Sequence, residues 1–352
     1  MDREMIAARL PSRREAPKEM VYAAIDIHKQ TLQAAVLDPA TGAIVERRLA
    51  ATRQDLVAWA MPLRGRAALV AIEATTGWRW IWRELTALGF DVRLADPVQV
   101  KALRGRSKRA KTDRLDARWL VLLLAKAMLP ECWLPPAEIQ ALRDKTRLRK
   151  ALVEDRTRWA QRLHALLTHE GWACKRRSLL SVAGRRWLDG LALPAAVRGH
   201  VDTLLRLIDA VTEELRELDL ELRRFARRDP RCLALRTIFG VGPIIACHIL
   251  AELGAGARFR RARQAVRVAG LDPVVEESGE KKRRGRLAKH GSPELRWALV
   301  EAAQKASWPS SPDHPLYASV KSRSGGQEAA LTVARKIARR AYHVLRDLEQ
   351  AA

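Results

Sequence analysis

The chain has 352 residues, enough for about two or three domains of ~150 residues, and its 48% apolar residues can fill sizeable cores. Disorder throughout the chain is therefore not expected. Lys and Arg number 65 against 40 Asp and Glu, which leaves a formal charge of +25. Such an excess is typical of proteins that neutralise phosphates, so a polyanion is the first partner to consider.

The ends and the cysteines indicate a cytoplasmic protein without a membrane segment. The first 20 residues are charged and lack the apolar core of a secretory signal. The longest uncharged, mostly apolar run, residues 237–251, is shorter than the ~18 to 20 residues that span a bilayer. The cysteines are widely spaced and form no C-x-x-C, which excludes the usual zinc spacings and predicts reduced thiols. They are Cys132, Cys174, Cys232 and Cys247.

Residues 20–130 alternate between strand and helix patterns, which predicts a mixed sheet covered by helices. Strands are expected at residues 21–36, 42–49, 67–74 and 90–95, the first one interrupted by polar residues at 26–30. Helices are expected at residues 55–61, 78–88 and 119–128. A strongly basic stretch, residues 101–118, precedes the last helix. This α/β region is the first predicted domain.

Prolines at 130, 135 and 136 mark a boundary, after which residues 137–228 read as long charged helices. Within 201–225, apolar residues recur at alternating steps of three and four, the seam of a coiled coil. The seam consists of Val201, Leu204, Ile208, Val211, Leu215, Leu218, Leu222 and Phe225. Residues 138–169 are its expected partner, although Arg149 and Arg156 interrupt their apolar pattern. Packing within one chain and an oligomerisation stalk both remain open.

Residues 230–350 are predicted to form a third, mostly helical domain. Two helical stretches flank Gly240-Val241-Gly242, as in helix-hairpin-helix elements, whose backbone N–H groups hold a DNA phosphate. A simple turn is the alternative. Residues 274–286 are polar and punctuated by glycine, and helical patterns return at 293–306 and 327–349.

Four carboxylates lie where core packing does not explain them. Asp26 interrupts an apolar strand, Glu73 ends another, and Asp113 and Asp116 are three residues apart in a basic segment, on one face of a helix. Oxygen ligands suit Mg²⁺, and two ions about 3.5 to 4 Å apart support phosphoryl transfer. The four residues therefore form a candidate metal site. Surface ion pairs with neighbouring arginines are the alternative for either helical aspartate alone.

Several motifs, in this order, resemble those of the DEDD transposases of the IS-one-ten insertion-sequence family. The resemblance covers residues 20–348. The motifs are Ile25-Asp26-Ile27-His28-Lys29, Ile72-Glu73-Ala74-Thr75-Thr76-Gly77-Trp78, Ala95-Asp96-Pro97, Lys111-Thr112-Asp113-Arg114-Leu115-Asp116-Ala117, Gly240-Val241-Gly242-Pro243, Ala269-Gly270-Leu271-Asp272-Pro273, Ser278-Gly279 and Lys289-His290-Gly291.

The resemblance implies an RNase H-like, RuvC-type domain joined through a coiled coil to a C-terminal transposase domain. It implies a recombinase that cuts and rejoins DNA, is guided by a structured RNA, and acts as a homo-oligomer, a dimer or a tetramer. Asp26, Glu73, Asp113 and Asp116 would be catalytic ligands of Mg²⁺. A serine of the C-terminal domain would act as nucleophile and form a covalent bond to a DNA phosphate.

Two serines compete for that role. Ser278 follows the Ala-Gly-Leu-x-Pro element at the family's spacing and precedes the basic residues 281–284. Ser292 is better explained as a helix N-cap with Pro293 at the first helical position. Ser278 is therefore the expected nucleophile, although Glu277 and Glu280 beside it depart from the family's pattern.

Two other functions are compatible with the same residues. A Holliday-junction resolvase would use the four carboxylates to activate water, without a serine. A nucleic-acid-binding module with a decayed nuclease site would bind and not cut, but the four intact carboxylates argue against decay.

Overall fold

The computed structural model describes residues 20–64, 66, 68–103, 113–172, 179–278 and 281–351, with the backbone alone at 113–115, 274–278 and 281–286. The chain divides into two compact units, Met1–Leu134 and Pro135–Ala352. The predicted division of the second unit near residue 230 stays a prediction. Among the described helices, none has the length and apolar character needed to cross a membrane.

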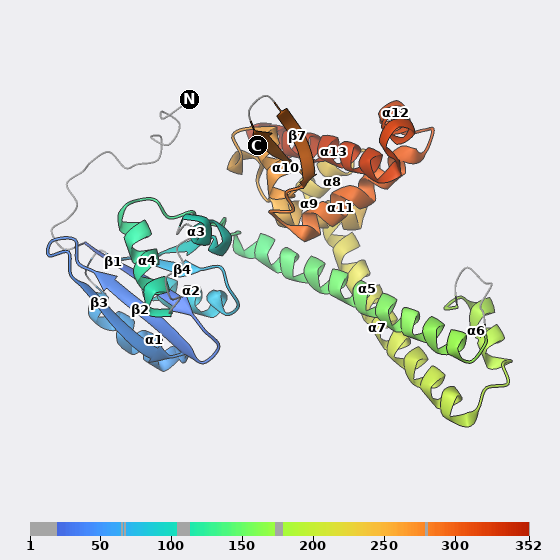
Figure 1. Ribbon diagram of the computed structural model, residues 1–352, viewed down its shortest axis with the longest axis horizontal. Coiled ribbons are helices and arrows are strands. Elements are labelled where there is room, and N and C mark those ends of the chain that lie inside the picture. The colour runs from blue at the N-terminus through green and yellow to red at the C-terminus, as the bar shows by residue number, and fades with distance from the viewer. Residues whose placement is uncertain are drawn as a thin grey trace. The chain divides into compact units, whose positions relative to one another are not determined.

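The first unit is built on a five-stranded mixed sheet of order β3-β2-β1-β4-β5 (Figure 1). The strands are β1 (Val21–Ile27), β2 (Thr31–Leu37), β3 (Ile44–Ala50), β4 (Ala68–Glu73) and β5 (Asp91–Ala95). The pairs β1–β2 and β2–β3 are antiparallel, whereas β1–β4 and β4–β5 are parallel. The predicted α/β region with a mixed sheet is therefore confirmed, and it is compatible with an RNase H-like fold.

The apolar run at 21–36, predicted as one interrupted strand, is in fact a hairpin of two strands. The backbone N–H of His28 donates to the carbonyl of Thr31 over 2.9 Å, which closes a tight turn. Lys29 and Gln30 are exposed in that turn. The polar interruption is thus the point where the chain reverses, and both apolar halves enter the same sheet.

Helices cover both faces of this sheet. On one face lie α1 (Arg53–Ala60) and α2 (Trp78–Ala87), and on the other lies α4 (Asp113–Ala125) (Figure 1). Side chains of β1 alternate between the two cores, because successive residues of a strand point to opposite faces. Ile25 packs with the α1 and α2 side chains, whereas Ala24 packs with those of α4. The short helix α3 (Pro97–Leu103) follows β5.

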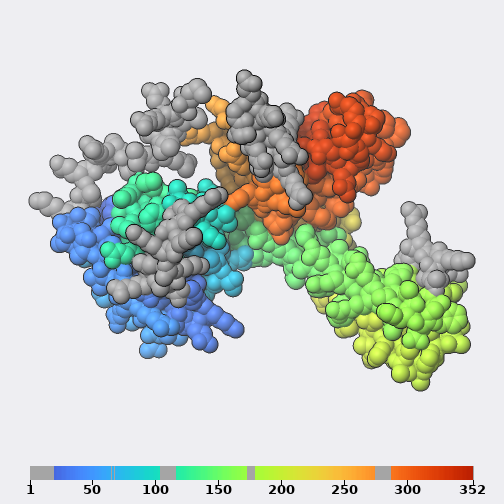
Figure 2. All heavy atoms as spheres, in the orientation of Figure 1, coloured from blue at the N-terminus to red at the C-terminus, as the bar shows by residue number. Residues whose placement is uncertain are grey.

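In the second unit, two long helices pack against each other within the chain. These are α5 (Ala137–His169) and α7 (Ala195–Arg228), with α6 (Val182–Asp189) at the far end of the pair (Figure 1). Figure 2 shows the pair projecting from the orange and red C-terminal elements. We call α5, α6 and α7 the helical arm. Contact within one chain accounts for the predicted seam without a second subunit.

Half of the predicted seam is fully buried in this packing. The buried residues are spaced by seven, at Val201, Ile208, Leu215 and Leu222. The alternate seam residues are only partly buried: Leu204, Val211, Leu218 and Phe225. Arg149, which interrupts the apolar pattern of α5, has its Nε 2.5 Å from a carboxylate oxygen of Asp219 on α7. This charged residue therefore supports the packing of the two helices.

The C-terminal elements of the second unit are mainly helices that surround α9 and α13. They are α8 (Pro230–Leu235), α9 (Pro243–Leu253), α10 (Ala262–Val268), α11 (Pro293–Gln304), α12 (His314–Ser324) and α13 (Gly326–Ala351), with the strand pair β6 (Pro273–Ser278) and β7 (Lys281–Leu287). The predicted helices on both sides of Gly240 are α8 and α9. Of the cysteines, Cys232 and Cys247 are buried free thiols, Cys132 is partly buried, and Cys174 lies outside the described residues.

Candidate functional site

The site is built where β1 and β4 end side by side. The two strands are parallel and Ile25 pairs with Ile72, so the next residues, Asp26 and Glu73, lie at the same level on adjacent strands. Strands in a sheet are about 4.8 Å apart. The two carboxylates therefore extend from neighbouring positions at the carboxyl ends of these two inner strands.

Strand alternation directs both carboxylates toward α4. Ala24 and Ala71, each two residues before a carboxylate, pack in the core that α4 covers. Side chains two residues apart on a strand share a face, so Asp26 and Glu73 share the face of Ala24 and Ala71. The sheet and α4 thus bring together residues that are far apart in the sequence.

The helix α4 supplies the other pair of predicted ligands. Ala117 on α4 is fully buried against the sheet, which holds the preceding residue, Asp116, near the strand ends. Asp113 is the first residue of α4, one turn before Asp116. The backbone thus carries both aspartates on the first turn of the helix, and the side chain of Asp113 lies outside the described residues.

Asp26 is the most buried carboxylate of the group, 5% exposed. Burial raises the pKa of Asp26, the neighbouring His28 lowers it, and the negative charge of Asp116 raises it further. The net pKa is above the ordinary value, because desolvation and a like charge both disfavour the ionised form. A divalent cation would relieve both effects, and a buried carboxylate of this kind is a typical metal ligand.

His28 is a site residue that the sequence analysis did not single out. Its Nε2 lies 3.1 Å from Oδ2 of Asp26, and its side chain is 39% exposed. The sequence contained a signal for the contact between His28 and Asp26, because residues two apart near the end of a strand tend to share a face. His28 can hold one oxygen of Asp26 and leave the other for a ligand.

The loop after Glu73 is a second structured part of the site. Gly77 adopts a positive φ of 96° at the start of α2, a conformation that glycine adopts without strain. The hydroxyl oxygen of Thr75 is buried and has no hydrogen-bond partner among the described residues. Unpaired buried hydroxyls are rare and costly, so this one is available to a ligand at the strand ends.

The described donors fit a divalent metal in kind. Among the described side chains, no three His, Cys, Asp or Glu groups lie close enough together to hold a metal ion, and Asp113 is outside that set. The side chains of Asp26, Glu73 and Asp116 offer only oxygen donors, which Mg²⁺ prefers over the nitrogen and sulfur donors of zinc sites. The joint coordination of one or two ions remains a prediction.

The two candidate serines occupy different kinds of position in the second unit. Ser278 is the last residue of β6 and pairs with Lys281 of β7, and its side chain lies outside the described residues. Ser292 is the N-cap of α11, where its hydroxyl accepts from the backbone N–H of Leu295 over 3.1 Å. Pro293 follows at the first helical position, so the predicted capping role of Ser292 is confirmed.

Comparison with known proteins connects both units to transposases. A family model described as "Transposase", of the DEDD type of IS110 elements, matches residues 23–170. A second, described as "Transposase IS116/IS110/IS902 family", matches residues 232–318. The first match includes the positions of all four candidate carboxylates and of His28.

Individual relatives agree with the family models. The chain is 28% identical to a "Probable family 20 transposase" of Pseudomonas aeruginosa, over 80% of this chain and 82% of the relative. It is 26% identical to the "Transposase for insertion sequence element IS1111A" of Coxiella burnetii, over 83% and 79% of the two chains. It is also 26% identical to the "Transposase for insertion sequence element IS1328" of Yersinia enterocolitica, over 67% and 70%.

Proposed function

Since the chain belongs to the IS110/IS116 family of insertion-sequence transposases, enzymes that cut and rejoin DNA, we propose that it does so with four carboxylates and one serine. Asp26, Glu73, Asp113 and Asp116 hold Mg²⁺ next to the scissile phosphate. Ser278 is the nucleophile.

One observation carries the carboxylate part of this proposal. In the register of β1 and β4, Asp26 and Glu73 lie at the same level and on the same face of the sheet, the face that α4 covers. Burial is the main cause of the raised pKa of Asp26, and the negative charge of Asp116 adds to it. Asp26 and Glu73 thus lie on adjacent strands, and Asp116 is close enough for its charge to act on Asp26, although about 90 positions separate Asp26 from Asp116. Asp113, one turn from Asp116, completes the set.

When bound, Mg²⁺ would polarise the phosphate and stabilise the negative charge that develops on it. The protein's own groups hold and orient the ligands: His28 fixes one oxygen of Asp26, and the rigid sheet fixes Asp26 relative to Glu73. The buried Thr75 hydroxyl can donate to a phosphate oxygen at the strand ends.

The chemical step forms a bond between Oγ of Ser278 and phosphorus and breaks the bond to one ester oxygen of the strand. The serine proton ends on the released oxygen, which becomes a free hydroxyl. A serine hydroxyl needs activation at neutral pH, and the Mg²⁺ site is its source in this proposal. Because the phosphodiester energy is retained in the protein–DNA bond, the strand can be joined to a new partner without a high-energy cofactor.

Assembly and guidance complete the proposal. A structured RNA guides the chain to its DNA, and the active form is a homo-oligomer, a dimer or a tetramer. The helical arm acts as a coiled coil within the chain, and its partly buried positions Val211 and Leu218 could add contacts to a second copy. The +25 charge supports binding of nucleic acid.

Trapping of a covalent adduct tests this function. The full chain is incubated with Mg²⁺, labelled cognate DNA and the RNA transcribed from the DNA that flanks the gene, and is then denatured. We expect a labelled band that survives denaturant and disappears in Ser278→Ala. The matched control is Ser292→Asn, which removes a hydroxyl but keeps a capping side chain, and it should still form the band.

The alternatives give different results in the same assay. An adduct in Ser278→Ala would show that another residue is the nucleophile. Nicked DNA without any adduct would favour the resolvase, in which metal-activated water attacks. Binding without cleavage, unchanged by Mg²⁺, would favour the nucleic-acid-binding module.

A further inference from the structure

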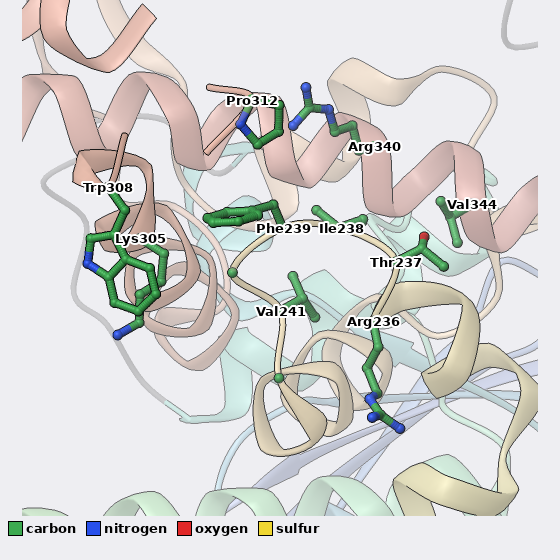
Figure 3. A pocket seen from close by; sticks show the side chains of 12 residues that line it. Arg236, Thr237, Ile238, Phe239, Val241, Lys305, Trp308, Pro312, Arg340 and Val344 are labelled. Carbon is green, nitrogen blue, oxygen red and sulfur yellow. The ribbon is translucent and has the colours of Figure 1, made fainter. Parts of the chain in front are cut away.

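A cavity of about 850 Å³ lies in the second unit, and its lining includes none of the four carboxylates and neither candidate serine. One wall is the turn between α8 and α9, residues 236–242. The other consists of Lys305 and Trp308 after α11, Pro312 before α12, and Arg340 and Val344 on α13 (Figure 3). We call it the hairpin cavity. Its volume is within the ~300 to 1,000 Å³ typical of ligand pockets.

The wall formed by the turn is rigid. Gly240 has a positive φ of 88°, and a Cβ at this position would lie 2.4 Å from the backbone oxygen of Ala302. Only glycine allows this close approach to α11. The cavity is therefore a fixed feature between two closely packed elements.

Aromatic and apolar side chains form much of the cavity surface. Figure 3 shows Phe239 extending from the turn toward the wall that carries Lys305 and Trp308. Trp308 is 51% exposed, which is unusual for the largest aromatic side chain, because burial of such a ring is strongly favourable. Lys305 Nζ lies 4.4 Å from the centre of the Trp308 ring. An exposed ring held by a cation is a ready stacking surface.

The charged residues that line the cavity are all positive: Arg236, Lys305 and Arg340. Arg340 already binds the buried Asp313, at 2.5 and 3.1 Å. Arg236 and Lys305 are exposed and form no ion pair with any described residue. Two cations without counter-ions beside an aromatic platform point to a ligand that has both negative charge and a flat ring.

We propose that the hairpin cavity binds an unpaired nucleotide of a nucleic-acid strand, with its base on Trp308 and its flanking phosphates on Arg236 and Lys305. Every base has a π-face that stacks on aromatic side chains, independently of sequence. In a duplex these faces are covered by neighbouring base pairs, so only a single-stranded or flipped-out nucleotide can present one. The ligand is thus a single strand.

This inference shares with the proposed function only the premise that the chain handles nucleic acid. The carboxylates and Ser278 take no part in it. A binding assay without Mg²⁺ can therefore succeed or fail independently of the adduct assay. Its success would assign a strand-holding role to the turn of the second unit.

Equilibrium binding tests the stacking. The full chain is titrated into a fluorescent 12-nucleotide dT strand and into a 20-base-pair duplex, and anisotropy is measured. We expect Trp308→Ala to weaken single-strand binding by at least about fivefold, the lower end for one stacked base, and duplex binding by less than about twofold. Trp308→Phe keeps a ring and should restore most of the affinity. Equal losses on both DNAs, or no loss, would overturn the proposal.

The salt dependence tests the phosphate contacts without touching the ring. Arg236→Gln/Lys305→Gln should reduce the slope of log K against log salt for the single strand by ~1.4, that is ~0.7 for each phosphate. The matched control, Arg223→Gln/Arg227→Gln, removes two exposed charges of α7. A control that changes the slope as much would show that the cavity has no special role.

Cross-linking distinguishes DNA from RNA. One strand carries 5-bromodeoxyuridine and its RNA counterpart 5-bromouridine, and each is irradiated with the full chain before digestion and mass spectrometry. A cross-link at Trp308 supports the proposal, and the strand that forms it identifies the natural ligand. Cross-links confined to other peptides would contradict it.

Discussion

The guanidinium of Arg147 on α5 donates two hydrogen bonds, of 3.0 and 3.2 Å, to the carboxylate of Glu252 on α9. Glu252 is almost completely buried, and Arg143 lies 3.6 Å from the same carboxylate. These contacts connect the base of the helical arm to the C-terminal helices of the same unit. Because two arginines of α5 surround one buried carboxylate of α9, the packing of these two helices depends on the charge of Glu252.

We expect Glu252→Ala to destabilise the second unit by ~3 kcal/mol, since it removes the buried carboxylate that Arg143 and Arg147 share. Arg147→Ala should cost less, because Glu252 keeps Arg143. Urea unfolding followed by circular dichroism measures both. Glu213→Gln, which removes an exposed ion pair with Arg216 on α7, is the control and should leave the midpoint unchanged. Equal midpoints for Glu252→Ala and wild type would contradict the structural importance of this contact.

Asp26→Asn should abolish strand cleavage and raise thermal stability. The pKa of Asp26 is raised in the folded chain, so the carboxylate binds a proton more strongly when folded than when unfolded. Its contribution to stability is therefore present at low pH and is lost as pH rises through the folded pKa. At pH 7 the neutral amide avoids this loss. Differential scanning calorimetry without metal measures the effect.

Asp38→Asn is the control for this change, because the pKa of Asp38 is shifted in the opposite direction to that of Asp26. Asp38 is a half-buried turn residue whose pKa is lowered, chiefly by the backbone N–H of Ala40. Its charge is favourable at pH 7, so the amide should not raise the melting temperature. A lower melting temperature for Asp26→Asn at pH 7 would mean that the contact between Asp26 and His28 outweighs the cost of burial.

His248 should make the second unit sensitive to acid. It is fully buried against Trp297, and both ring nitrogens have no hydrogen-bond partner among the described residues. Burial, assisted by the charges of Arg149 and Lys150 and opposed by Asp219, lowers the pKa of His248 to about 3. Below pH 6.5 the unfolded chain binds a proton that the folded chain does not, so stability falls as pH falls from 6.5 toward 3.

Replacing this residue tests the explanation. Between pH 6.5 and 4.5 the loss from His248 alone is about 2 to 3 kcal/mol, and His248→Leu should remove that part of the pH dependence. The variant should be no less stable than wild type at pH 7, because it eliminates two unpaired buried nitrogens. His200→Leu, at an exposed position of α7, should keep the wild-type profile. Parallel profiles for His248→Leu and wild type would refute the assignment.

Two glycine-to-alanine changes should have opposite signs. Gly240→Ala combines a positive φ with a contact of 2.4 Å to a backbone oxygen, and we expect a loss of about 2 to 4 kcal/mol. Gly199→Ala, in α7, meets no atom within 4 Å and should stabilise by about 0.5 to 1 kcal/mol. Denaturant midpoints compare them directly. A neutral Gly240→Ala would show that the turn can move away from α11.

The alternation of strands and helices in the first unit could be predicted because apolar periodicity directly reflects which side chains face a core. The division of residues 21–36 into β1 and β2 could not, since both halves are apolar and only the exposed Lys29 and Gln30 reveal the turn. In the second unit, the pairing of Arg149 with Asp219 was hidden, because a charged residue in a seam looks unfavourable until its partner is known.

The residues of the candidate site were likewise only partly predictable from the sequence. Asp26 and Glu73 stood out as carboxylates in apolar strands, and the structure makes them neighbours by register. The contact of His28 with Asp26 depends on local geometry after the strand, which periodicity does not describe. The nucleophile could be argued only from motif spacing, and Ser278 stays a prediction, whereas the capping role of Ser292 follows from simple helix chemistry and is confirmed.

The spacing of the buried α7 residues limits how the helical arm can change in length. Val201, Ile208, Leu215 and Leu222 keep one face toward α5 only if residues are inserted or deleted in multiples of seven, and in both helices together. Each such step moves the tip at α6 by about 10 Å, at 1.5 Å per residue. A single-residue insertion would rotate every later seam residue by about 100° and expose it to water. Chains whose helical arms differ in length should therefore differ by multiples of seven residues in each of the two long helices.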